Sequence, residues 1–178
     1  FKKQSYEDLM SATDRGRETI RGYLRRVSGS QMVSNFRPVT ASSLYRLFCD
    51  EGDTVWDMSC GWGGRLLGSI KAKVNYIGTD PNTKTMKGLK EMAKTFGNKA
   101  QSYELLTMGS EDYKPKKNSL DFAFTSPPYF DTERYSNEKT QSFLKFTNIE
   151  SWKDKFLRKT IDNVYRGLKQ NKFMALNV

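Results

Sequence analysis

Histidine is absent from the 178-residue chain, and cysteine occurs only twice, at Cys49 and Cys60. Zinc sites draw most of their ligands from these two residue types, and a Ser-His-Asp triad needs an imidazole as its base. The spacing of the two cysteines matches no common metal-binding motif. The sequence therefore argues against a zinc centre and against histidine-based nucleophilic catalysis, and we expect no bound metal.

Long apolar runs are also missing. No stretch approaches the roughly 20 apolar residues that a membrane-spanning helix needs, and the amino-terminal residues lack the pattern of an export signal. The chain begins at Phe1 and ends in the apolar run 173–178. We expect a cytoplasmic protein without a membrane partner, and we interpret the sequence as a trimmed fragment.

Acidic residues are fewer than basic ones. There are 20 Asp and Glu against 30 Lys and Arg, which gives a formal net charge of +10. Such a surplus attracts the phosphate backbone of nucleic acids whatever their sequence. Nucleic acid, and DNA in the first place, is therefore the expected partner. The alternative on charge alone is a basic surface that serves solubility.

The first 34 residues differ from the rest of the chain. Apolar residues over 6–27 recur at a spacing compatible with a helix, and arginines lie between them. We expect a basic helical segment over 1–34, with a face that is either solvated or in contact with DNA. The remaining residues, 35–178, are expected to form one domain.

Short apolar runs alternate with helical stretches over 35–178. The pattern predicts strands over 54–58, 76–79, 102–106 and 120–125 and from Phe173 onward, and helices after Thr40 as N-cap, from about Arg65, over 83–96 and over 150–168. This alternation is typical of βαβ units in a doubly wound, parallel α/β sheet. The polar stretch 131–148 is predicted to be a long loop, either solvated or bordering DNA.

A glycine-rich turn follows the first predicted strand. Asp57 precedes this turn, in which Gly61 and Gly63 permit positive φ and a close approach of the backbone to a ligand. The Gly-Lys-Ser/Thr of a phosphate-binding loop is missing. The Asp57 carboxylate disfavours a pyrophosphate and suits a cationic ammonium group. The turn therefore indicates a cofactor that carries an amino acid.

A second carboxylate, Asp80, ends the strand predicted over 76–79. An acid at this place in a doubly wound sheet typically accepts hydrogen bonds from ribose hydroxyls. An ammonium group together with a ribose describes S-adenosylmethionine, which is the expected cofactor. A tight turn without a ligand is the alternative when the glycines are considered alone.

The segment Ser126-Pro127-Pro128-Tyr129 follows the strand predicted over 120–125, at the edge where open α/β sheets bind their ligands. Two successive prolines stiffen the backbone, so the carbonyl groups of Ser126 and Pro127 are expected to accept hydrogen bonds from an amino group. Tyr129 offers an aromatic face on which an extruded base can stack. A rigid turn beside a core tyrosine is the structural alternative.

Together, the motifs DMSCGWGG, IGTD and TSPPYF resemble the motif series of the DNA amino-methyltransferases, which modify cytosine at N4 or adenine at N6. The resemblance covers roughly residues 35–178. It implies a Rossmann-like doubly wound methyltransferase sheet, truncated after its fifth strand. It also implies an S-adenosylmethionine-binding catalytic domain over 35–178 whose C-terminal part is missing.

The resemblance further implies roles for individual residues. Ser126, Pro127, Pro128 and Tyr129 are implied to bind the target amino group of the base. Four groups of residues are implied to bind the cofactor: Asp57, Ser59, Cys60, Gly61 and Gly63 at its methionine part, Asp80 and Pro81 at its ribose, Ser110 and Glu111 at its adenine, and Arg37, Pro38 and Thr40 at its carboxylate end.

We therefore expect a DNA methyltransferase that transfers the sulfonium methyl group directly to an exocyclic base nitrogen, without a covalent enzyme intermediate. By the same resemblance, Ser126 favours cytosine N4 over adenine N6. Cys60 lies in the cofactor turn, so we expect it to pack there instead of acting as a nucleophile. The alternatives are an RNA base methyltransferase and a non-catalytic nucleic-acid-binding protein with a degenerate methyltransferase fold.

Overall fold

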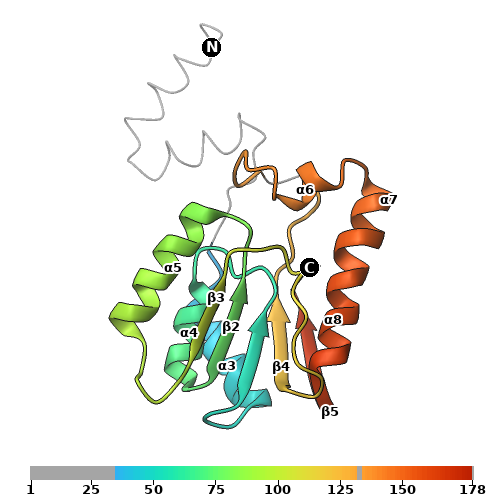
Figure 1. Ribbon diagram of the computed structural model, residues 1–178. Helices are drawn as coiled ribbons and strands as arrows, with labels where there is room; N and C mark the ends of the chain where they lie inside the picture. The colour runs from blue at the N-terminus through green and yellow to red at the C-terminus, as the bar shows by residue number, and fades with distance from the viewer. Residues whose placement is uncertain (1–34, 132–133, 178) are drawn as a thin grey trace, which may run out of the picture. The chain divides into compact units, whose positions relative to one another are not determined.

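The computed structural model describes residues 35–131 and 134–177, and by its internal contacts Asn35–Val178 is one compact unit. The basic helical segment expected over 1–34 lies outside the described residues. Five parallel strands form a single sheet in the order β3-β2-β1-β4-β5 (Figure 1). Their bounds are Thr54–Asp57 for β1, Asn75–Thr79 for β2, Tyr103–Leu106 for β3, Leu120–Thr125 for β4 and Leu168–Leu176 for β5.

Helices cover both faces of this sheet (Figure 1). One face carries α3 (Pro38–Phe48), α4 (Gly64–Ala72) and α5 (Thr83–Phe96), whereas the other carries α7 (Ile149–Trp152), the π-helical turn η1 (Lys153–Arg158) and α8 (Lys159–Gly167), preceded by the short α6 (Ser142–Lys145). This arrangement is the Rossmann-like doubly wound α/β fold that the sequence predicts. Within the described residues, no helix is long and apolar enough to cross a membrane.

The central strands are apolar on both sides because helices cover both faces. Every residue of β4 is buried, and so are Val55, Trp56 and Asp57 of β1. Parallel strands in such a position form near-continuous apolar runs instead of alternating ones. These two strands are therefore recognisable in the sequence by their composition.

The larger of two buried clusters joins three helices to the sheet. Tyr45 of α3, Leu66 of α4 and Leu89 of α5 pack in it with Phe122 and Phe124 of β4. The Tyr45 ring lies edge-on to both phenylalanine rings, with centroid distances of 6.2 and 6.1 Å. Edge-to-face pairs at this distance add to the stabilisation that comes from burial alone.

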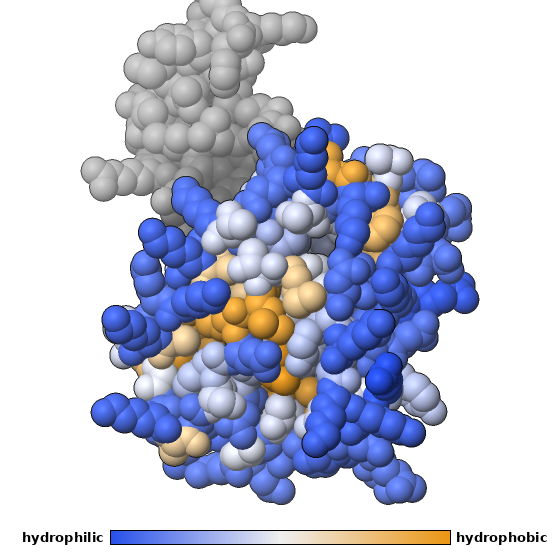
Figure 2. All heavy atoms as spheres, viewed as in Figure 1, coloured by the Kyte–Doolittle hydropathy of each residue, from blue (hydrophilic) through white to orange (hydrophobic). Residues whose placement is uncertain are grey.

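The smaller cluster lies on the opposite face, where Trp56 and Ala123 pack with Val164 of α8. The partly buried side chains of Ile77 and Tyr113 pack against it. Figure 2 shows apolar side chains gathered on this face beside α8, surrounded by hydrophilic ones. Apolar side chains on this face are therefore left partly exposed.

The carboxyl ends of all five strands lie along one edge of the sheet, because every strand pair is parallel. β1 pairs with β2 on one side and with β4 on the other. The chain therefore reverses its direction across the sheet at β1 and β4, and such a switch point is where doubly wound sheets bind ligands. The loops after β1, β2, β3 and β4 follow one another along this edge.

The helix start predicted at Thr40 is wrong. α3 begins at Pro38 with Arg37 as N-cap, and Thr40 lies exposed inside the helix. Proline suits the first helical position, where its missing N–H would have no intrahelical partner and its φ is already helical. This preference outweighs the capping tendency of the threonine.

The carboxyl-terminal elements also differ in detail from the prediction. The helix expected over 150–168 contains the π-helical turn, and Leu168 already belongs to β5, which begins well before the expected start at Phe173. The polar first half of β5 forms ion pairs, in which Lys169 and Lys172 lie 2.8 and 3.4 Å from the carboxylate of Asp121. The stretch 131–148, predicted to be a loop, contains the short helix α6.

Two glycines inside helices provide a matched test of the α3–α4 contact. A Cβ on Gly68 of α4 would lie 2.5 Å from Cβ of Ala41 and 2.9 Å from the carbonyl oxygen of Pro38, whereas a Cβ on Gly88 of α5 would meet nothing within 4 Å. We expect Gly68→Ala to lower the free energy of unfolding by about 1–3 kcal/mol through overpacking. Gly88→Ala should raise it by roughly 0.5–1 kcal/mol. Urea denaturation measures both, and equal effects would contradict the packing.

Candidate functional site

The Asp57 carboxylate lies completely buried at the carboxyl end of β1. Its Oδ2 accepts hydrogen bonds from Nε of Arg65 and from the hydroxyl of Tyr76, both at 2.7 Å. Its Oδ1 accepts from the hydroxyl of Thr125 at 3.1 Å and from the backbone N–H of Ser59 at 3.3 Å. A carboxylate offers about four acceptor positions. All of them are used here, and they tie α4, β2, β4 and the glycine turn to β1.

Arg65 carries the charge that balances Asp57. Its guanidinium lies over the rings of Phe36 and Phe124, 5.6 and 5.8 Å from their centroids, and a terminal nitrogen donates to the carbonyl of Ser59. Burial opposes the charged form, but the adjacent carboxylate outweighs burial and raises the pKa of Arg65. The arginine therefore stays charged and holds the backbone of the glycine turn.

The predicted contact between Asp57 and a cofactor ammonium group stays a prediction. The four donors leave the carboxylate no further acceptor position. An ammonium group that binds Asp57 directly therefore has to replace one of them. In the arrangement observed, Asp57 can affect a ligand only indirectly, because it positions the glycine turn.

Asp80 holds the glycine turn from the neighbouring strand. Its Oδ2 accepts from the backbone N–H of Gly61 at 3.1 Å, and its Oδ1 accepts from that of Asn82 at 2.9 Å. Each oxygen keeps one acceptor position, so the carboxylate has room for two hydrogen bonds from a ligand. Burial raises the pKa of Asp80, and the two N–H groups offset this only in part. Pro81 follows, half-buried, and leads into α5.

The glycines of the turn are required for two different reasons. Gly61 has a φ of +50°, and a Cβ there would meet only the Ser59 carbonyl, at 3.8 Å. Gly63 has a φ of +85°, and a Cβ there would lie 2.7 Å from Leu89 and 2.9 Å from Met92 of α5. Gly61 therefore has the open side that the predicted cofactor contact needs, whereas Gly63 allows the turn to pack on α5.

Cys60 is packed inside the same turn and is 2% exposed. Its Sγ lies 3.8 Å from Sδ of Met86, and its backbone N–H donates to the carbonyl of Thr79 at 3.1 Å. Burial raises the pKa of the Cys60 thiol, which keeps it neutral. A buried neutral thiol is a poor nucleophile, in agreement with the packing role expected from the sequence.

The segment before α3 lies against the first residue of α4. A Cβ on Gly64 would overlap the carbonyl oxygen of Phe36. Arg37 and Pro38 follow directly, so they lie close to the end of the glycine turn. Thr40, the third residue predicted to contact the cofactor from this segment, is exposed on α3.

Ser110 and Glu111 lie buried in the loop after β3 and bind neighbouring helices. Oγ of Ser110 is 2.9 Å from Oγ1 of Thr160, and the side-chain amide of Asn163 donates to the carbonyls of Ser110 and Glu111. Oε1 of Glu111 accepts from Lys145 at 2.7 Å, whereas its Oε2 has no hydrogen-bond partner within the described residues. An unpaired buried carboxylate oxygen is costly. Oε2 is thus the acceptor in this loop that best suits a ligand amino group.

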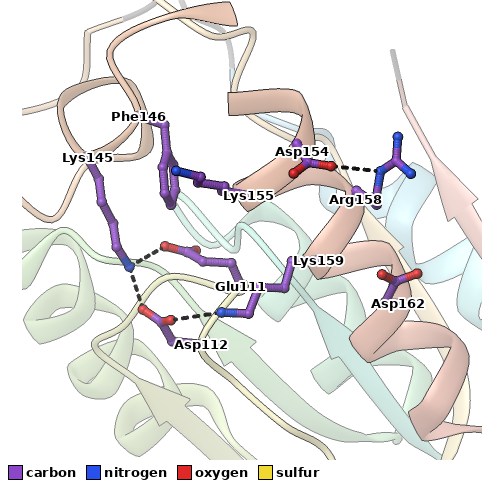
Figure 3. A pocket seen from close by; sticks show the side chains of 9 residues that line it. All are labelled: Glu111, Asp112, Lys145, Phe146, Asp154, Lys155, Arg158, Lys159 and Asp162. Atoms are coloured by element: carbon purple, nitrogen blue, oxygen red, sulfur yellow. Dashed lines mark hydrogen bonds and ion pairs between the residues drawn. The ribbon is translucent and has the colours of Figure 1, made fainter. Parts of the chain in front are cut away.

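A groove of about 460 Å³ adjoins this carboxylate (Figure 3). Glu111, Lys145 and Phe146 line it together with side chains of η1 and α8. Its charged lining residues are four acidic and four basic ones. The groove is therefore polar without an excess of charge of either sign.

The segment Ser126-Pro127-Pro128-Tyr129 leaves β4 at the same edge of the sheet and is held by the residue after β5. Oγ of Ser126 and the hydroxyl of Tyr129 donate to the carbonyl of Asn177, at 3.3 and 3.4 Å. The side-chain amide of Asn177 donates back to Oγ of Ser126 at 3.2 Å. The Tyr129 side chain is fixed in this way although the residue is 41% exposed. Its aromatic ring is therefore both positioned and accessible.

The backbone around the two prolines is only partly exposed, because Pro127 is buried whereas Ser126 and Pro128 are half-buried. No described residue donates a hydrogen bond to the carbonyl of Ser126 or of Pro127. Phe130 follows with a φ of +50°, a region that bulky residues rarely adopt. Its ring packs on Trp152 with a centroid distance of 6.0 Å. Surrounding packing has to impose such a conformation, so the segment is held rigidly at both ends.

Sequence reasoning gave no organising role to three residues of this edge, namely Arg65, Lys145 and Asn177. Their partners Asp57, Glu111 and Ser126 lie 8, 34 and 51 positions away. The contacts to Lys145 and Asn177 have no local signal, whereas Arg65 directly follows the glycine turn. Among the described side chains, no group of three His, Cys, Asp or Glu residues is placed to hold a metal ion.

Loss of the buried ion pair should lower the free energy of unfolding much more than loss of an exposed one. We expect Arg65→Met to lower the free energy of unfolding by about 3–5 kcal/mol, because it leaves Asp57 buried without its counter-charge. Lys73→Met removes the partner of Glu51 from an exposed pair with an N–O distance of 2.8 Å and should cost about 0–1 kcal/mol. Urea denaturation of both variants checks this. A similar small loss in both would show that the Asp57 pair is not essential.

No protein-family model matches this sequence, and no curated protein matches it. Solved structures do match. Mycolic acid cyclopropane synthase CmaA1, complexed with SAH and CTAB, is 18% identical with a TM-score of 0.52 over 78% of this chain and 40% of that one. Phosphoethanolamine N-methyltransferase 2 of Haemonchus contortus, in complex with phosphomonomethylethanolamine and S-adenosylhomocysteine, is 15% identical with a TM-score of 0.53 over 77% and 27%.

A SAM-dependent methyltransferase from Methanosarcina mazei is 19% identical, with a TM-score of 0.52 over 75% of this chain and 55% of that one. The chain spans less than two thirds of the length of each of these three proteins. At such identities the likeness establishes the fold alone. The chain has the Rossmann-like α/β fold of S-adenosylmethionine-dependent methyltransferases.

Proposed function

We propose that this chain is the cofactor-binding and catalytic part of a methyltransferase that uses S-adenosylmethionine to methylate the exocyclic amino group of a base in DNA. The observation that carries the proposal is the hydrogen bond of 3.1 Å between Thr125 and Asp57. Thr125 directly precedes the Ser-Pro-Pro-Tyr segment, and Asp57 directly precedes the glycine turn. The predicted acceptor site and the predicted cofactor site are therefore joined through one contact.

The residues at the carboxyl edge fit S-adenosylmethionine. Gly61 leaves open space where a side chain would lie, and the Asp80 carboxylate keeps two acceptor positions beside it. The unpaired Oε2 of Glu111 lies in the next loop along the same edge. These features suit, in order, the methionine part, the ribose hydroxyls and the adenine amino group of the cofactor.

The cofactor supplies an electrophilic methyl group on a sulfonium centre, and the protein's part is to position the two reactants. Asp80 would accept hydrogen bonds from the ribose hydroxyls, and Arg37 would lie near the carboxylate end. Asp57 and Arg65 would act through the backbone of the turn, which they hold at the N–H and the carbonyl of Ser59. A preorganised turn lowers the cost of ordering the site when the ligand binds.

The Ser-Pro-Pro-Tyr segment provides what an amino-group acceptor needs. The lone pair of a base amino group is delocalised into the ring, so the group is a weak nucleophile. Two carbonyls that accept its hydrogens, those of Ser126 and Pro127, would hold it in a more reactive geometry. Tyr129 would stack on the extruded base. The transfer is then a direct displacement, and no covalent enzyme intermediate is required.

DNA is the proposed substrate because of the formal net charge of +10 and the resemblance of the motifs to the DNA amino-methyltransferases. Ser126 as the first residue of the acceptor motif favours cytosine N4 over adenine N6 in that family. Cys60 is buried and neutral, which fits a reaction without a cysteine nucleophile.

Cofactor binding is the first test. We expect calorimetry to detect saturable binding of S-adenosylmethionine and S-adenosylhomocysteine, and Asp80→Ala to raise the Kd about 10–100-fold through loss of hydrogen bonds to a charged acceptor. Because the pKa of Asp80 is raised, affinity should fall on acidification at a higher pH than for an ordinary carboxylate. Asp50→Ala, which removes an exposed carboxylate before β1, should change neither. A folded chain that binds neither compound would overturn the proposal.

Methyl transfer is the second test. Unmethylated genomic DNA would be incubated with the protein and S-adenosylmethionine, and its nucleosides would be analysed by mass spectrometry. We expect N4-methylcytosine, and we expect Tyr129→Ala to reduce the rate by about 5–150-fold, which corresponds to about 1–3 kcal/mol of base stacking. Tyr129→Phe keeps the ring but loses the hydrogen bond to Asn177, so its rate should fall less than that of Tyr129→Ala. If N6-methyladenine forms instead, the target base is adenine and not cytosine. If RNA is methylated in a parallel reaction and DNA is not, DNA is refuted as the substrate.

A further inference from the structure

Residues 134–148, here called the strap, follow the Ser-Pro-Pro-Tyr segment and lie across the loops that are proposed to bind the cofactor. The sequence predicts a loop here, either solvated or bordering DNA. In the structure, side chains of the strap bind the loops after β1, β2 and β3 in turn. These are the loops assigned above to the methionine part, the ribose and the adenine. The strap therefore spans the proposed cofactor site from one end to the other.

The first contact is aromatic. Tyr135 of the strap and Trp62 of the glycine turn have a centroid distance of 6.5 Å and perpendicular ring planes. Trp62 is 50% exposed. A large side chain in the middle of a glycine turn is thus covered on one side by the strap instead of by the core.

The second contact lies beside Asp80. The Glu138 carboxylate accepts hydrogen bonds from the backbone N–H of Thr83 at 3.2 Å and from its hydroxyl at 3.0 Å. Thr83 is the first residue of α5, where an anion is stabilised by the unpaired N–H groups and the helix dipole. The hydroxyl of Thr140 also donates to the carbonyl of Pro81, at 3.3 Å. The strap is thereby attached to the loop that carries the proposed ribose acceptor.

The third contact is made by Lys145 (Figure 3). Its ammonium group lies 2.7 Å from Oε1 of buried Glu111 and 2.6 Å from Oδ2 of Asp112. The hydrogen bond from Lys145 lowers the pKa of Asp112, so this end of the strap carries a full ion pair. The other oxygen of Glu111 has no partner within the described residues. A ligand amino group that binds Oε2 would share the Glu111 carboxylate with Lys145.

We propose that the strap closes the nucleoside side of the cofactor site, and that Glu138 and Lys145 are positioning residues that limit the rate at which cofactor and product leave. The inference rests on the proposed function, since it takes the three loops to be the cofactor loops. A ligand held between the sheet edge and the strap leaves only after one of these attachments opens.

Dissociation kinetics test the proposal. S-adenosylhomocysteine would be passed over the immobilised full chain, and its association and dissociation rates would be read by surface plasmon resonance. We expect Lys145→Met and Glu138→Gln each to speed dissociation on the order of tenfold, the loss of one charged hydrogen-bonding group. Lys145→Arg keeps the charge and both carboxylate partners and should restore slow dissociation. Lys73→Met, which breaks the exposed pair with Glu51 elsewhere, should leave the rate unchanged.

Proteolysis gives an independent reading that does not depend on a variant folding normally. Arg134 and Lys139 are exposed trypsin sites within the strap. We expect S-adenosylhomocysteine to slow cleavage at these sites in the unmodified chain. Cleavage that is unaffected by bound ligand would overturn the proposal.

The outcomes separate this inference from the proposed function. Slow dissociation in the unmodified chain that both substitutions accelerate, with unchanged unfolding midpoints, supports the strap as described. Binding with the same dissociation rate in all variants overturns the strap alone. Absence of binding to the unmodified chain overturns the cofactor assignment and the strap with it.

Discussion

Four segments of the chain meet at the Asp57 carboxylate, and the geometry of the carboxyl edge depends on this buried anion. Strand β2 is attached through Tyr76, β4 through Thr125, α4 through Arg65 and the glycine turn through Ser59. A well-packed apolar group of the same volume can stabilise a core as well as an ion pair does. It offers no directed hydrogen bonds, however, and here those bonds fix the glycine turn and the Ser-Pro-Pro-Tyr segment relative to each other.

The elements that the sequence predicted best are those whose bounds are set by residues close to them in the sequence. Helix α5 was predicted over 83–96 and has those bounds, because Asn82 caps it through the N–H of Thr85 and Gly97 follows its last residue. Strand β4 was predicted over 120–125 and also has those bounds. Its run is buried throughout and has Leu120, Phe122, Ala123 and Phe124 as apolar residues, and Pro127 shortly after it prevents the strand from continuing.

The parts that sequence did not predict depend on contacts between distant positions. The strap was predicted to be a loop, which agrees with its lack of regular structure outside α6, but its attachments join Glu138 to Thr83 and Lys145 to Glu111, 55 and 34 positions away. Two partners of Asp57, Tyr76 and Thr125, were missed for the same reason, since they lie 19 and 68 positions away. The sequence identified the motif residues at this edge, whereas their hydrogen bonds are set by the three-dimensional arrangement. The assigned contacts to a cofactor and to a base stay predictions.

The strand order has a consequence for the synthesis of the chain. β1, β2 and β3 are consecutive and pair with each other, but the other edge of β1 pairs with β4, and Thr54 and Asp121, which bond across these strands, are 67 positions apart. At roughly 5–20 residues per second, a ribosome needs several seconds to make that interval. During this time an apolar central strand has an unpaired edge, and exposed edges of this kind recruit other chains. A nascent chain that stalls before Leu120 is therefore exposed to aggregation although three of its strands already have partners.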